Sequence, residues 1–168
     1  RAARIRTDDA FDGGAIPNVM DLRPGDGPET EIAWRVAMER TGGPSFLALS
    51  RQKVRVLARA GSGVAADDSV SGRLASADGL RRGAYVLVDA SDAAPSVIIL
   101  ASGSELSLAV DARSQLEADG IPTRVVSMPS WHLFSQQDEA YRDEVLPPSV
   151  TARVSVEAGS VKRMRKCE

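Results

Sequence analysis

The 168-residue sequence has little of several features that mark well-defined protein classes. Its single cysteine, Cys167, cannot form an internal disulfide, which excludes a disulfide-rich secreted domain, and we interpret it as a free thiol. No apolar run approaches the roughly 20 residues that cross a bilayer, so no membrane partner is expected. The N-terminal RAARIRTDDAF lacks the apolar segment of a signal peptide and does not begin with methionine. We therefore expect a cytoplasmic and incomplete chain.

Neither sign of charge dominates the sequence. The 21 basic and 23 acidic residues give a net charge of −2, so we expect no basic face and no nucleic acid partner. Hydrophobic residues make up 43% of the chain, which is enough for a packed core and too many for a disordered protein. A chain of this length forms one ordinary domain or two small ones.

The first half of the chain predicts a strand–helix–strand unit. Residues 1–15 show no clear periodicity, and we expect an arm of uncertain structure there. Residues 19–22 (VMDL) and 45–49 (SFLAL) predict two short buried strands, because each is an apolar run bounded by proline or glycine. With a helix between them they form a βαβ unit, which is right-handed in almost all proteins.

The helix between these strands has clear start and stop signals. GDGP at 25–28 could be taken for a phosphate-binding loop, but a helix cap explains it without a ligand. Asp26 is expected to cap the helix, Glu29 to complete a capping box, and Pro28 to occupy the first turn. The glycine pair at 42–43 ends the helix. Its inward stripe is predicted to consist of Ile32, Ala33, Val36 and Ala37.

The second half of the chain predicts a further alternation of strands and helices. Residues 58–82 are rich in alanine, serine, glycine and aspartate, and predict a linker partly wrapped on the surface. Strands are predicted for AYVLVDA, SVIILAS, TRVVSM and TARVSVEAG, with a short polar surface helix in SQQDEAYRDEVL. A longer helix opens at 103–105 and ends at Gly120. Its inward residues are expected to be Leu108, Ala109, Ala112 and Leu116.

These elements predict an α/β protein of two incomplete three-layer units with mostly parallel sheets, joined by a linker. No nucleophile elbow, Walker loop, dinucleotide fingerprint or metal-ligand spacing is present, and we name no catalytic, cofactor-binding or metal-ligating residue. Ser104 at a helix start could help to bind an anion, but a simple N-cap explains it better. His132, the single histidine, lacks a partner at a defined spacing, which disfavours catalysis. Trp34 and Trp131 are interpreted as packing residues.

Arg51 is the one residue whose position suggests a binding site. It follows a predicted buried strand, and parallel α/β sheets place their ligands at the carboxyl ends of their strands. A guanidinium group suits bidentate binding of phosphate. From spacing alone, a solvated loop arginine and an anion-binding arginine remain open alternatives.

Two long segments resemble one enzyme family. AIPNVMDLRPGDGPETEIAWRVAMERTGGPSFLALSRQKV resembles the later half of the pyrimidine-binding domain of transketolases. The stretch from RRGAYVLVDA to SVEAGS resembles the start of their C-terminal domain. Three motifs carry the resemblance: LSRQ, VVSMPS followed by QDEAYRDEVLP, and EAGS. It implies four parts: an arm (1–15), a partial pyrimidine-binding domain (16–57), a linker (58–82) and a truncated C-terminal domain (83–168).

The resemblance also implies a chemistry. Transketolases transfer a two-carbon ketol unit between sugar phosphates in the pentose phosphate pathway, as homodimers that use thiamine diphosphate and a divalent cation, Mg or Ca. The arginine of the SRQ motif, which matches Arg51, helps to bind the substrate phosphate in that family. Residues before Ala15 supply none of the family's cofactor-activating groups, and VKRMRKCE after Ser160 matches nothing in it. We therefore expect this chain alone to bind no cofactor and to be inactive. The alternatives are a non-catalytic dimerisation module and the C-terminal subunit of a split transketolase.

Overall fold

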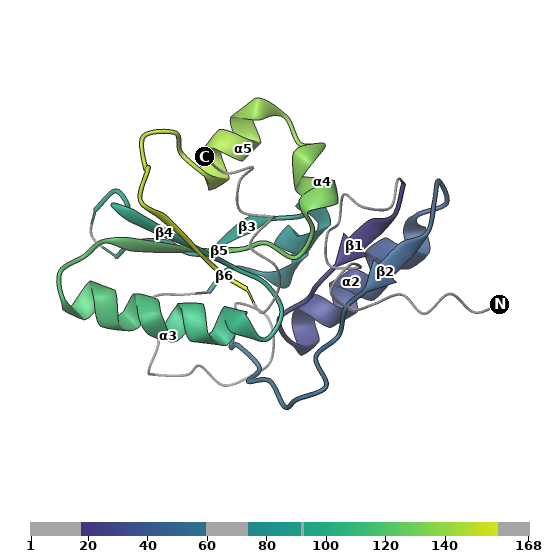
Figure 1. Ribbon diagram of the computed structural model, residues 1–168, viewed down its shortest axis with the longest axis horizontal. Helices are drawn as coiled ribbons and strands as arrows, with labels where there is room; N and C mark the ends of the chain where they lie inside the picture. The colour runs from purple at the N-terminus through teal and green to yellow at the C-terminus, as the bar shows by residue number, and fades with distance from the viewer. Residues whose placement is uncertain (1–17, 60–73, 92, 158–168) are drawn as a thin grey trace.

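The computed structural model describes residues 18–59, 74–91 and 93–157 (Figure 1). Two sheets, several helices and one 3-10 helix make up this part of the chain. In sequence order the elements are β1 (Met20–Leu22), α2 (Gly27–Glu39), β2 (Ser45–Leu47), η1 (Ala77–Arg82), β3 (Tyr85–Val88), β4 (Val97–Ala101), α3 (Glu105–Ala118), β5 (Thr123–Ser127), α4 (Trp131–Ser135), α5 (Glu139–Val145) and β6 (Arg153–Val156).

The predicted βαβ unit is present at the start of the described chain. Strands β1 and β2 pair in parallel, with Met20 opposite Ser45. Asp26 caps α2 by accepting a hydrogen bond from the Glu29 N–H at 3.1 Å, as predicted. The Glu29 carboxylate reaches one residue further back than a capping box requires, since it accepts from the Gly25 N–H at 2.7 Å. The strand–turn–helix segment is therefore fixed by two carboxylates.

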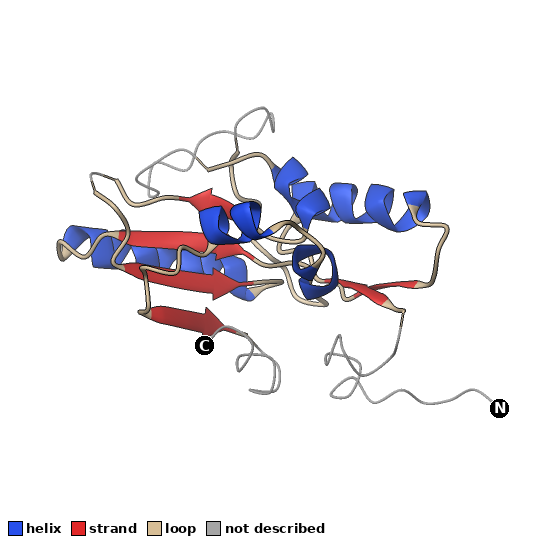
Figure 2. Cartoon of the chain, turned by 90° about the horizontal axis from the view of Figure 1, so that it is seen from above, coloured by secondary structure: helices blue, strands red, loops and turns tan. Residues whose placement is uncertain are grey.

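The second sheet has four strands in the order β3-β5-β4-β6. Strand β4 pairs in parallel with both β5 and β6, whereas β3 is antiparallel to β5 at one edge. This arrangement confirms the predicted α/β class with mostly parallel sheets. Figure 2, seen from above, shows these four strands side by side, with the two-stranded sheet at one end of them.

Helices cover both faces of the four-stranded sheet. In β4, Ile99 and Ala101 point to the face covered by α3, while Ile98 and Leu100 point to the face covered by α4 and α5. Figure 1 shows α3 below the sheet and α4 and α5 above it. The continuous apolar run in β4 follows from this burial on both faces.

One hydrophobic core joins the two sheets. Met20 and Ile32 of the first unit belong to the same buried cluster as Leu87, Leu106 and Val125 of the second. The described ends of segment 58–82 also enter this core. Its buried residues there are Arg59, Leu74, Ala77 and Leu80. These ends are therefore partly buried, with exposed residues such as Asp78 and Arg81 next to the buried ones. Residues 60–73 lie outside the described part, and the division into domains stays a prediction.

Several predicted packing residues lie elsewhere than expected. Leu108 of α3 is 59% exposed, and the buried stripe of that helix contains Leu106 and Arg113 instead. The Arg113 guanidinium is satisfied by backbone carbonyls, including those of Asp89 and Thr123, so a long polar side chain takes an inward position that the apolar pattern could not predict. Trp34 is 52% exposed, contrary to its interpretation as a packing residue.

The short strand β2 also differs from its prediction. It ends at Leu47, and neither Phe46 nor Leu49 is buried. The sequence did not predict the short helix α4, although its N-cap, Ser130, accepts from the Leu133 N–H in the ordinary way. In the described part of the chain, no helix combines the length and apolar character needed to cross a membrane.

Gly83 offers a direct test of how tightly η1 packs on α4. Its φ of 88° favours glycine, and a Cβ there would lie 2.2 Å from the Phe134 backbone nitrogen. We expect Gly83→Ala to lower the free energy of unfolding by about 3–5 kcal/mol, because steric overlap adds to the unfavourable backbone conformation. Gly120→Ala is the matched control: its φ is 76°, but open space surrounds its Cβ position, and we expect a loss of about 1–2 kcal/mol. If urea denaturation shows the same loss of unfolding free energy for Gly83→Ala and Gly120→Ala, close packing at Gly83 does not contribute to stability.

Candidate functional site

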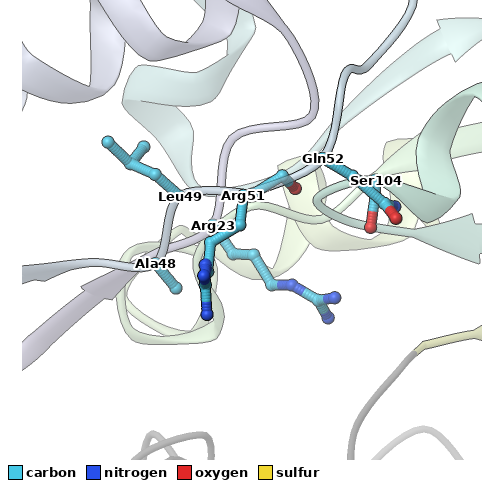
Figure 3. A pocket seen from close by; sticks show the side chains of 7 residues that line it. Arg23, Ala48, Leu49, Arg51, Gln52 and Ser104 are labelled. Carbon is cyan, nitrogen blue, oxygen red and sulfur yellow. The ribbon is translucent and has the colours of Figure 1, made fainter.

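A pocket of about 530 Å³ lies where β1 and β2 end. Arg23 follows β1 directly, and Arg51 lies four residues after the last residue of β2. Figure 3 shows the labelled side chains around this pocket. The lining residues are Arg23, Ala48, Leu49, Ser50, Arg51, Gln52 and Ser104. Arg51 therefore lies in the loop after a parallel strand, and not directly after a buried strand as the sequence had predicted. Its side chain is exposed to solvent, and its binding role stays a prediction.

Arg51 belongs to a segment without regular structure, residues 48–56, which we call the arginine loop. The loop is anchored at its start, where the Ala48 N–H donates to the Leu22 carbonyl at 2.9 Å. Just past its end, the Leu57 N–H donates to Asp26 Oδ2 at 3.1 Å. Arg55 adds an ion pair to Asp111 of α3 at 2.6 Å. These contacts hold the loop that carries Arg51 against both halves of the molecule.

A second arginine of the pocket, Arg23, binds two glutamates of the other half of the chain. Its Nη2 donates to Glu105 at the start of α3 at 2.6 Å, and its Nη1 donates to Glu157 just after β6. Ser102 donates to Glu157 at 2.7 Å, and Ser104 donates to Glu105 at 2.8 Å. We call Arg23, Glu105 and Glu157 the Arg23 cluster. It lies at the point where β1, β6 and α3 meet.

Ser104 does not play the role predicted for it. It occupies the N-cap position of α3, but its φ and ψ of −61° and −22° are helical and its side chain makes no capping hydrogen bond. Its hydroxyl donates instead to Glu105, its neighbour in the chain. Ser104 thus brings the second half of the chain to the wall of the pocket that contains Arg51.

A buried polar cluster is centred on Glu29. The carboxylate of Glu29, which is fully buried, accepts from Tyr85 at 2.6 Å and from Ser127 at 2.7 Å. Arg59 donates to Asp26 and lies 3.4 Å from Glu29. The first half of the chain contributes three members of this cluster: Asp26 and Glu29 at the start of α2, and Arg59 shortly after the arginine loop. The second half contributes Tyr85 of β3 and Ser127 of β5. We call these five residues the Glu29 cluster.

The Glu29 cluster changes the acidity of Tyr85. Burial and the negative charge of Glu29 raise the pKa of the Tyr85 phenol well above its usual value. The positive charge of Arg59 opposes this shift only in part. Tyr85 therefore remains a neutral hydrogen-bond donor to Glu29 at every physiological pH.

His132 lies outside the pocket-lining set. Its Nε2 is 3.0 Å from Arg40 Nη1 and 3.0 Å from Gln136 Nε2, which places it in a contact between α2 and α4. Arg40 also donates to the Asn18 carbonyl at 2.8 Å, so this histidine helps to join β1 to α4. The arrangement agrees with a structural role for His132.

The described residues do not fit a divalent cation. No group of three or more histidine, cysteine, aspartate or glutamate side chains in residues 18–59, 74–91 and 93–157 could hold a metal ion. Two carboxylate pairs of the described residues are each bound to a guanidinium, Asp26 and Glu29 to Arg59, and Glu105 and Glu157 to Arg23. A cation would have to displace an arginine from either pair.

Comparison with known proteins agrees with this architecture. A family model described as the transketolase-like TK C-terminal domain matches residues 83–167. The chain belongs to the transketolase family. It is 45% identical over 146 residues to the transketolase of Geobacillus stearothermophilus, an alignment that covers 87% of this chain and 20% of that protein. The chain thus spans about a fifth of the length of the curated relatives it matches.

Solved structures show the same relationship. The transketolase from Leishmania mexicana superposes with a TM-score of 0.76 at 41% identity, covering 92% of this chain and 20% of that one. A Pichia stipitis transketolase described as a complex with sedoheptulose-7-phosphate gives a TM-score of 0.72 at 38% identity, covering 90% and 20%. A structure described as a split gene transketolase, an inactive beta4 tetramer, gives 0.60 at 26% identity, covering 87% and 41%.

Sequence reasoning found Arg51 but missed Arg23 and Glu157. Each of the missed residues directly follows a strand, Arg23 after β1 and Glu157 after β6, which is the kind of position that singled out Arg51. The sequence segments LRPG and EAGS therefore contained a local signal for Arg23 and Glu157. That these two residues form an ion pair could be seen only in the three-dimensional structure. Glu29 was predicted as a local capping residue, and nothing in the sequence indicated that Tyr85 and Ser127 would bind it.

The raised pKa of Tyr85 leads to a test by pH. A phenol whose pKa is higher in the folded than in the unfolded state contributes stability that is complete below the unfolded pKa of about 10 and is lost as the pH rises past it. We expect Tyr85→Phe to cost about 1.5–3 kcal/mol at neutral pH, because a hydrogen bond to a buried carboxylate is lost. Its free energy of unfolding should then fall less steeply above about pH 10 than that of the wild type.

Tyr141→Phe is the control for this measurement, since burial also raises the pKa of Tyr141, whose hydroxyl donates to a backbone carbonyl and not to a carboxylate. At neutral pH, Tyr141→Phe should lower the free energy of unfolding by less than Tyr85→Phe does, about 0.5–1.5 kcal/mol. Urea denaturation at a series of pH values measures both variants. A Tyr85→Phe curve parallel to the wild-type curve in alkali would contradict the assigned pKa direction.

Proposed function

We propose that this chain is part of a transketolase that transfers a two-carbon ketol unit between sugar phosphates in the pentose phosphate pathway, and that Arg51 binds the substrate phosphate. Membership of the transketolase family and the position of Arg51 in the pocket support the proposal. A similar Pichia stipitis transketolase is described as a complex with a sugar phosphate. For the whole enzyme the proposal includes thiamine diphosphate, a divalent cation, a homodimer and a cytoplasmic location.

The observation that carries the proposal is the exposed Arg51 guanidinium at a pocket of suitable size. A volume of about 530 Å³ is within the range of small-molecule sites. Five of the seven lining residues, 48–52, come from the arginine loop, so the loop forms most of the wall. A guanidinium group in such a wall can bind a phosphate through two parallel hydrogen bonds.

For the 168-residue chain by itself we propose a binding role without catalysis. The carboxylates beside the pocket are bound to arginines, which suits the recognition of an anion better than the binding of a metal–diphosphate group. A specific observation favours the alternative of a subunit that works only with a partner: the structure described as an inactive beta4 tetramer of a split gene transketolase shares this fold.

Replacing Arg51 tests the phosphate-binding role. In a full-length transketolase that contains this segment, Arg51→Ala should raise KM for a phosphorylated acceptor by about 10- to 150-fold, which corresponds to a hydrogen bond to a charged group worth about 1.5–3 kcal/mol. KM for the unphosphorylated acceptor should stay within about twofold, because it offers no phosphate to this guanidinium.

The matched control is Arg81→Ala, which removes an exposed arginine that pairs with Glu39 and does not line the pocket. In steady-state kinetics, this variant should have the same KM as the wild type for both acceptors. If Arg51→Ala raises KM equally for the phosphorylated and the unphosphorylated acceptor, the proposed phosphate contact is refuted.

Calorimetry tests the proposal that the chain alone lacks a cofactor site. We expect no heat of binding when the 168-residue chain is titrated with thiamine diphosphate and magnesium, because the carboxylates near the pocket are already held by guanidinium groups. A full-length transketolase titrated under the same conditions is the positive control. Tight binding by the 168-residue chain would overturn this part of the proposal.

A further inference from the structure

We propose that Arg23 is a positioning residue that makes the pocket able to accept a phosphate dianion, because it neutralises Glu105 and Glu157 at the pocket wall. The inference deepens the proposed function and rests on the proposed binding of a substrate phosphate in this pocket. It also gives the second half of the chain a part in substrate specificity, since both glutamates and Ser104 come from that half.

The geometry places two carboxylates beside an anion site. Glu105 adjoins the lining residue Ser104 in the chain, and both Glu105 and Glu157 are bound to the lining residue Arg23. The side chains of Arg23, Glu105 and Glu157 are 11%, 17% and 15% exposed, so water screens their charges only in part. A dianion bound at Arg51 would be exposed to the field of these three groups.

The balance of charge depends on Arg23. With Arg23 and Arg51 both present, their positive charges offset those of the two glutamates. Without Arg23, two partly buried carboxylates remain next to the pocket and a single arginine faces them. Like charges repel more strongly when they are partly buried than when water screens them fully, so an incoming phosphate would bind more weakly.

Neutralisation explains the position of Arg23 better than direct contact with the ligand. Its Nη1 and Nη2 each donate to a glutamate, so both terminal nitrogens already serve the carboxylates. Ser102 donates to Glu157 and Ser104 donates to Glu105, so each glutamate has a second hydrogen-bond donor besides Arg23. The cluster is therefore built as a unit around the two carboxylates.

The backbone of Arg23 is held independently of its side chain. Its N–H donates to the Pro129 carbonyl at 2.8 Å, and its carbonyl accepts from the Gly103 N–H at 3.1 Å. Replacement of the side chain by methionine, which retains much of the alkyl stem, leaves both backbone bonds in place. Arg23→Met is thus a variant in which charge changes more than structure.

The test measures binding of inorganic phosphate to the full 168-residue chain labelled with ¹⁵N, followed through the side-chain Nε–H signal of Arg51 and nearby amides. Arg23→Met should raise Kd for phosphate about tenfold at low salt, and the increase should shrink at high salt because the effect is electrostatic. The triple variant Arg23→Met, Glu105→Gln, Glu157→Gln should return Kd to within about threefold of the wild type, because the repelling charges are gone as well.

Two controls separate charge from structure. Arg81→Met removes a positive charge distant from the pocket lining and should leave Kd unchanged. Glu105→Gln with Glu157→Gln in the presence of Arg23 should lower Kd about tenfold, because the positive charge of Arg23 is then unopposed. This last variant keeps the inference testable if Arg23→Met does not fold.

The outcomes are distinct. A triple variant as weak as Arg23→Met would show that Arg23 contacts the phosphate itself, and an unchanged Kd in Arg23→Met would show that it has no part in binding; either result overturns the inference. If Arg51→Ala binds phosphate as well as the wild type while Arg23→Met is weakened, the proposed role of Arg51 fails and the electrostatic role of Arg23 stands. Absence of phosphate binding by the wild-type chain would overturn both.

Discussion

The buried ion pairing of Glu29 and Asp26 with Arg59 is the interaction on which the rest of the structure depends. Two carboxylates and one guanidinium with almost no exposed surface are costly to bury, so each needs its partners in place. Those partners come from α2, from the segment after the arginine loop, and from β3 and β5. The cluster can form only when both halves of the chain are folded against each other, and it thereby couples their packing.

This coupling explains why the pocket has a defined wall. The arginine loop leaves β2 at one end and is tied to Asp26 just beyond the other, so the position of Arg51 follows from the position of the buried cluster. The Arg23 cluster then brings the start of α3 to the opposite side. Two groups of paired charges, one fully buried and one partly buried, thus hold in place a loop without regular structure.

Local signals in the sequence predicted a large part of this architecture. The capping residue Asp26, the stripe at Ile32 and Ala33, the glycine at 120 and the four strands of the larger sheet each depend on neighbours close in the chain. Arg51 could be found because strand ends are visible in a sequence. Contacts between residues distant in the sequence could not be predicted. The sequence indicates a capping role for Glu29 whether or not Tyr85 donates a hydrogen bond to it.

Buried arginines account for most of the remaining differences. Arg59 and Arg113 occupy interior positions that hydrophobic patterning does not predict for arginine, because carboxylates bind the Arg59 guanidinium and backbone carbonyls bind that of Arg113. The segment around Arg59 consequently looked like a surface linker. Trp34 is the reverse case, an apolar residue predicted to be buried that is exposed. An aromatic residue on a helix packs only where another element covers that face of the helix.

The hydrophobic cluster shared by the two sheets has a consequence for how such a gene can be divided. A breakpoint placed between Leu57 and Arg59 would leave one piece with two acidic groups, Asp26 and Glu29, that lack their cation, and the other with an apolar surface that lacks its cover. Recombination at that point would therefore produce two fragments that need each other, and not two interchangeable modules.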